Sequence, residues 1–172
     1  MIGLAAKVGG PVMLQFHVAT SLVGILSGFV MLYGLLLGRN FKTAIAVFFV
    51  TTILTSLTGF PLPPFGFDPP RAVGVLSLIL LIGAVAAYYG FRLAGAWRRI
   101  FVGCAVAALY LNMFVLVAQG FLKVPALHAL APTGSEPPFA IVQGIVLLIF
   151  IALGIAATIK FRPIDDRRWA GR

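Results

Sequence analysis

The sequence predicts an all-α membrane protein, a bundle of five transmembrane helices. Hydrophobic residues make up 61% of the 172 residues, and the mean hydropathy is +1.09. Charged residues make up only 10% of the chain, whereas a soluble domain carries roughly 25%. Five apolar stretches can each cross a bilayer core about 30 Å thick, which needs about 20 helical residues. We therefore expect one transmembrane domain over residues 1–172, with the lipid bilayer as its surroundings.

Each apolar stretch is expected to be helical, because a helix satisfies its own backbone hydrogen bonds in lipid. The first has an apolar run too long for a cleaved signal peptide and is expected to remain as a permanent helix. The second is short and rich in threonine, and prolines stand just before the third and the fifth. The fourth follows a pair of arginines. The expected spans are 12–38, 43–60, 72–91, 100–122 and 139–159.

Basic residues are divided unequally between the two sides that five spans create. One side holds three, Lys7, Arg71 and Lys123. The other holds ten, which are Arg39, Lys42, Arg92, Arg98, Arg99, Lys160, Arg162, Arg167, Arg168 and Arg172. Loops rich in Lys and Arg stay in the cytoplasm, so the N-terminus is expected outside and residues 160–172 as a basic cytoplasmic tail. Because the bases stand in short runs between apolar stretches, we interpret them as topology signals and expect no nucleic-acid partner.

Two loops on the expected outer side end alike, as GFDPPRAV (66–73) and GSEPPFAI (134–141). The likeness is compatible with a parallel repeat, in which the second and third helices correspond to the fourth and fifth. The alternative, which we favour, is local chemistry: an acid and two prolines are a good helix start. Thr133 and Glu136 also have the spacing of a capping box.

Small residues at four-residue spacing predict close helix packing. Gly24 and Gly28 form one such pair, Gly34 and Gly38 a second, and Ala152 and Ala156 a third. These faces suggest an accessory or scaffold component, packing against a second copy in a homo-oligomer or against a larger membrane complex.

Polar side chains within the spans gather in the expected outer half. His17, Ser21, Gly24 and Gly28 share one helix face, so His17 is expected to point into the bundle. One alternative function is therefore an outward-facing pocket for a small molecule, a lipid or a quinone, as in a binding or transporter-like module. The candidate residues are Gln15, His17, Thr55, Asn112, Gln119 and Gln143, with His128 and Asp68 or Glu136 as a lid. The competing interpretation is that hydroxyls bond their own helix and amides join neighbouring helices.

Catalytic and metal chemistry is not indicated. The chain has one cysteine, Cys104, and contains no phosphate-binding loop, nucleophile elbow or HExxH motif. We therefore predict no catalytic residue, no metal site and no cofactor. A weaker alternative is a redox protein that binds haem b through the two histidines, His17 and His128.

Three segments, residues 16–40, 51–69 and 111–139, together cover nearly half of the chain. They read FHVATSLVGILSGFVMLYGLLLGRN, TTILTSLTGFPLPPFGFDP and LNMFVLVAQGFLKVPALHALAPTGSEPPF. In these segments the chain resembles an uncharacterised family of small polytopic membrane proteins of bacteria, largely alphaproteobacteria. The resemblance implies a bacterial inner-membrane location and carries no activity or site residue.

Overall fold

The computed structural model describes residues 10–61 and 69–162, and this part of the chain is helical without strands. Among these residues, five helices are long and apolar enough to cross a membrane, which confirms the predicted all-helical architecture with five candidate spans. Their ends lie within three residues of the predicted ones. They are α2 (Pro11–Leu36), α3 (Lys42–Gly59), α4 (Pro69–Val85) with the π-helical turn η1 (Ala86–Gly90), α5 (Trp97–Lys123) and α7 (Pro137–Lys160).

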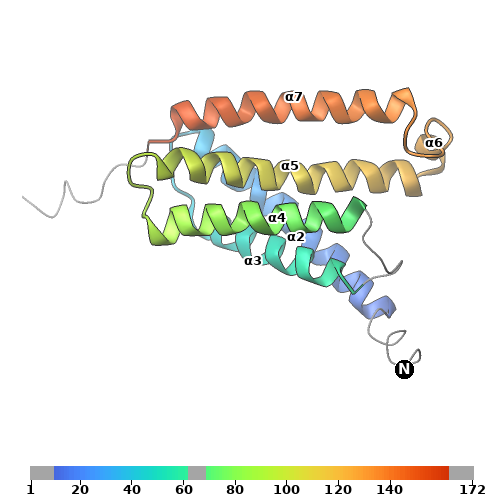
Figure 1. Cartoon of the computed structure of the whole chain (residues 1–172), viewed down its shortest axis with the longest axis horizontal. Helices are drawn as coiled ribbons and strands as arrows, with labels where there is room; N and C mark the ends of the chain where they lie inside the picture. The colour runs from blue at the N-terminus through green and yellow to red at the C-terminus, as the bar shows by residue number, and fades with distance from the viewer. Residues whose placement is uncertain (1–9, 62–68, 163–172) are drawn as a thin grey trace, which may run out of the picture.

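The helices form an antiparallel bundle in which most neighbours in sequence are neighbours in space. α2 packs on α3, α3 on α4, α4 on α5, and α5 on α7, while α2 also crosses α5 and α7 and closes the bundle. Figure 1 shows α7 along one edge and the beginning of α2 diverging from the other helices. We call the end where α2, α4 and α7 begin the His17 end, and the end where α3 and α5 begin the Arg98 end.

Prolines begin several helices, as the sequence suggested. Pro69 begins α4, and Pro137 begins α7 directly after Glu136. The proline ring fits the first turn because that turn has no use for its missing N–H. These two helix starts agree with local helix-start chemistry at both loops, and residues 66–68 of the first loop lie outside the described residues.

Gly38 follows the end of α2, which stops at Leu36. Its φ of +71° lies in the left-handed region. The Arg39 N–H donates to the Gly34 carbonyl at 2.8 Å, and the Gly38 N–H donates to the Leu35 carbonyl at 3.1 Å. This is a Schellman motif, in which glycine is favoured because it adopts positive φ without strain. The expected pairing of Gly34 with Gly38 on one helix face is thus corrected.

The apolar core lies mainly toward the Arg98 end. Phe48, Phe101 and Leu35 are fully buried there, and Phe101 packs edge-on against Phe49. Arg98 closes this end by donating hydrogen bonds to the carbonyls of Thr158, at 3.0 Å, and of Phe161. The guanidinium thereby joins the beginning of α5 to the end of α7, where carbonyls lack partners within their own helix.

Two short elements were not predicted. One is η1, which continues α4 into a turn where Arg92 and Leu93 have positive φ. The other is α6 (Pro125–His128), one helical turn inside the loop between α5 and α7. Both are too short to leave a periodic pattern in the sequence.

Candidate functional site

The most polar interface within the bundle lies between α2 and α3 at the His17 end. Nδ1 of His17 lies 3.0 Å from Oγ1 of Thr58. Ser21 donates to the His17 carbonyl at 2.7 Å, and its hydroxyl oxygen lies 3.4 Å from that of Thr55. His17, Ser21 and Gly24 follow one another at helical spacing, and so do Thr58, Thr55 and Thr51 in the opposite direction. The two antiparallel helices therefore face each other with matching polar rows.

The threonine hydroxyls also bond to their own helix. Thr58 donates to the Leu54 carbonyl at 2.7 Å, and Thr51 donates to the Val47 carbonyl at 2.7 Å. A hydroxyl has one proton, so when Thr58 donates to Leu54 it accepts from His17. The Nδ1 atom of His17 is then the donor to Thr58, and the ring is half-buried.

Asn112 extends this polar interface to α5. Its Nδ2 donates to Oγ1 of Thr52, which is fully buried, at 3.2 Å. One face of α3 thus contacts α2 through Thr55 and Thr58, and the adjacent face contacts α5 through Thr52. We call His17, Ser21, Thr52, Thr55, Thr58 and Asn112 the α3 polar cluster.

Gln143 lies in a different place, between α7 and α5. Its Nε2 donates to the Phe114 carbonyl at 3.0 Å, and the side chain is buried. Its Oε1 atom is buried and has no hydrogen-bond partner in the described part of the chain. A bundle of predominantly apolar spans thus contains one amide acceptor without a partner among the described residues.

The remaining predicted residues do not join either group. Gln15 is exposed on α2, and Gln119 is half-buried on α5 without a side-chain hydrogen bond to the described residues. His128 is exposed on α6. Asp68 lies outside the described residues. The structure therefore brings His17, Thr55 and Asn112 into one cluster and places Gln143 in another.

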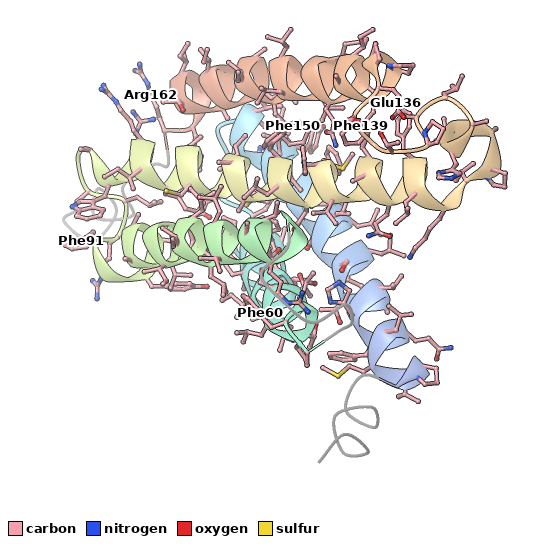
Figure 2. The ribbon with its side chains drawn as sticks, turned by 45° about the vertical axis from the view of Figure 1, so that its right-hand side comes forward. Phe60, Phe91, Glu136, Phe139, Phe150 and Arg162 are labelled. Atoms are coloured by element: carbon pink, nitrogen blue, oxygen red, sulfur yellow. The ribbon has the colours of Figure 1, made fainter. Side chains whose placement is uncertain are left out.

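Glu136 caps the loop that precedes α7 (Figure 2). Its two carboxylate oxygens accept the backbone N–H groups of Thr133, at 3.0 Å, and Ser135, at 3.1 Å. These hydrogen bonds hold the pKa of the Glu136 carboxyl below its ordinary value of 4.5, and the bond from the Thr133 N–H has the largest effect. The contact to Thr133 is half of the expected capping box, but the residue that precedes the first turn of α7 is Glu136, and α7 begins at Pro137, four residues after Thr133.

The two histidines belong to different elements, α2 and α6. The Nδ1 atom of His17 is hydrogen-bonded to Thr58. Within residues 10–61 and 69–162, no three His, Cys, Asp or Glu side chains are grouped closely enough to share a metal ion.

Two grooves lie toward the Arg98 end and were not predicted. One, of about 420 Å³, runs between α5 and α7, and its lining includes Gly103, Tyr110, Phe150 and Gly154. The other, of about 520 Å³, lies between α2 and α3 beside Phe41 and Lys42. Neither is lined by a predicted binding residue. The predicted site residues are polar, whereas the sequence signal for the first groove is glycine on two neighbouring helices.

The glycine face of α2 is filled within the chain. A Cβ placed on Gly28 would lie 2.5 Å from Cδ1 of Leu109 and 3.0 Å from Cδ2 of Phe48. A Cβ on Gly24 would lie 3.2 Å from Oγ1 of Thr51. This face therefore serves the fold and is closed to a second protein.

No family model, curated protein or solved structure matches the chain.

Proposed function

We propose that the chain is an integral protein of a bacterial inner membrane and serves as an accessory or scaffold component of a larger membrane assembly. The exposure of α7 is the observation that supports this role most directly. In the most apolar 18-residue segment of α7, only 11% of the segment is buried inside the bundle. In the corresponding segment of α5 the buried share is 39%. A transmembrane helix with so little contact inside its own bundle leaves most of its surface to lipid or to another protein.

The surface offered to a partner centres on Ala152. Ala152 is exposed on α7, between Leu148 and Ala156 at four-residue spacing. Small side chains on a transmembrane helix let a second helix approach closely. Gly24 and Gly28 are already covered by α3 and α5. Of the small-residue pairs predicted from the sequence, Ala152 and Ala156 on α7 are therefore the pair that we propose for the contact with a partner.

The α3 polar cluster supports a structural role for this end of the bundle. The hydroxyl groups of Thr52, Thr55 and Thr58 bond to neighbouring helices. Such hydrogen bonds between helices in membranes stabilise the bundle by about 0.6 kcal/mol each, with values up to about 1.7.

A comparison of two matched variants tests the role. A tagged chain is purified from native membranes after cross-linking, as the wild type, as Ala152→Phe and as Leu26→Phe. Leu26 is likewise exposed, on α2. We expect a constant partner, or a second copy of the chain, with the wild type and with Leu26→Phe, and its loss with Ala152→Phe. The absence of any constant partner from the wild type would overturn the proposal.

We also propose that the N-terminus lies outside and the C-terminus in the cytoplasm. Among the described residues, the Arg98 end carries Arg39, Lys42, Arg92, Arg98, Arg99, Lys160 and Arg162, and the His17 end carries Arg71 and Lys123. This imbalance supports a cytoplasmic position for the Arg98 end.

A further inference from the structure

The groove between α5 and α7 has the shape of a site for a long apolar chain. Its volume is about 420 Å³, within the range of roughly 300–1,000 Å³ that small-molecule sites occupy. On α7 its lining runs from Leu147 to Ile159, about 18 Å at 1.5 Å per residue. Gly103 and Gly154 keep it open, and no atom lies within 4 Å of a Cβ placed on Gly103.

Three exposed basic residues lie near the groove at the Arg98 end, and we call them the basic rim. Arg99 lies one helical turn before Gly103, and Lys160 and Arg162 follow the lining residue Ile159 almost directly. These three side chains are exposed. Figure 2 shows Arg162 beyond the end of α7, and Arg98 holds this end against α5 through the Thr158 and Phe161 carbonyls.

No described carboxylate balances this rim. Within residues 10–61 and 69–162 the only carboxylate side chain is Glu136, which begins α7 at the opposite end. The sequence from residue 163 onward adds three arginines and two aspartates, so its side chains do not reverse the balance. The groove is therefore apolar along its length and basic at one mouth.

We propose that this groove binds an anionic phospholipid, with one acyl chain along α5 and α7 and the phosphate beside Arg99, Lys160 and Arg162. The apolar lining matches the chain, and the rim matches the charge of the headgroup. Basic pockets between transmembrane helices are a known arrangement for anionic headgroups, and each nearby cation strengthens the attraction roughly fivefold. This site does not rest on the scaffold role, because Leu148, Ala152 and Ala156 do not line the groove.

Native mass spectrometry of the full chain, purified and delipidated in detergent, tests the site. Phosphatidylglycerol and phosphatidylethanolamine with identical acyl chains are added separately. We expect one phosphatidylglycerol to bind at least about tenfold more tightly than phosphatidylethanolamine. Equal retention of both would mean annular lipid only and would overturn the proposal.

Two pairs of variants locate the lipid. Gly103→Leu fills the groove, and Gly144→Leu is its control because Gly144 also faces open space but lies outside the lining. Arg99→Gln with Lys160→Gln removes rim charge, and Lys42→Gln with Lys123→Gln removes the same charge elsewhere. We expect Gly103→Leu and the rim pair to lose roughly tenfold or more in phosphatidylglycerol binding, with both controls unchanged. Equal binding by variant and control in either pair would contradict this placement.

Discussion

At the scale of single residues, the bundle is held by close contacts at glycine and by hydrogen bonds between hydroxyl, imidazole and amide groups. Gly28 marks the closest approach of α2 to its neighbours, because any side chain there meets Leu109 and Phe48. His17 and Thr58 show the second kind of contact. In lipid both matter, since apolar burial does not by itself favour helix association there.

Replacing Gly28 with valine should destabilise the fold. The added carbons overlap Leu109 and Phe48, and overpacking of this kind costs typically about 1–3 kcal/mol. Thermal unfolding in detergent should show a lower midpoint for Gly28→Val. Gly144→Val, on an open face of α7, should leave the midpoint close to that of the wild type. Similar midpoints for the two variants would contradict the packing described for α2.

A double-mutant cycle should detect the bond between His17 and Thr58. Measuring unfolding free energies of His17→Leu, Thr58→Val and the double variant should give a coupling of about 0.6–1.7 kcal/mol. The pair Gln15→Leu and Thr58→Val is the control, because Gln15 is exposed and makes no hydrogen bond to Thr58. The absence of coupling between His17 and Thr58 would show that their hydrogen bond does not stabilise the fold.

At the scale of elements, the spans were predictable and their partners were not. The length of an apolar stretch identifies a membrane helix because the thickness of the bilayer sets that length. The two prolines after Glu136 indicated where α7 begins. The bond from Gln143 to Phe114 depends on which helices are neighbours, which no local pattern in the sequence contains. Similarly, Gly38 was assigned to a helix face, because its spacing from Gly34 fits a packing pair as well as a helix end.

Arg98 should secure the end of α7. Hydrogen bonds to a charged group contribute about 1.5–3 kcal/mol, so Arg98→Met should lower the unfolding free energy in lipid-free detergent by about that amount. Hydrogen exchange should show faster exchange of the amides near Thr158 and Phe161. The control Arg99→Met removes an exposed guanidinium one residue away that makes no hydrogen bond to the described residues. Equal effects of the two variants would contradict this function of Arg98.

The loop before α7 should loosen in acid. The pKa of Glu136 is held below 4.5 in the folded loop, so the carboxylate stabilises this loop fully above that pH. The stabilisation should fall as the pH decreases below 4.5 through the lowered pKa, because the protonated carboxyl is a weaker acceptor. Exchange of the Thr133 and Ser135 amides, corrected for intrinsic rates, should increase over this range. In Glu136→Gln the same amides should exchange without this pH dependence.

At the scale of the whole molecule, the two ends of the bundle differ in how they are held together. The His17 end is joined by the α3 polar cluster between α2, α3 and α5. The Arg98 end is held by aromatic packing and by Arg98, and it carries most of the described cations. Such an asymmetric charge distribution favours a single orientation, because translocating basic loops is unfavourable.

The proposed orientation predicts which loops reagents reach in intact bacterial cells. With Cys104→Ser as background, Ser135→Cys places a thiol in the loop between α6 and α7, and Ala94→Cys places one between η1 and α5, both at exposed positions. A membrane-impermeant maleimide should label position 135 in intact cells and position 94 only after permeabilisation. The opposite pattern would reverse the orientation. Labelling of both positions in intact cells would contradict the spanning arrangement itself, because α7 and α5 begin at opposite ends of the bundle.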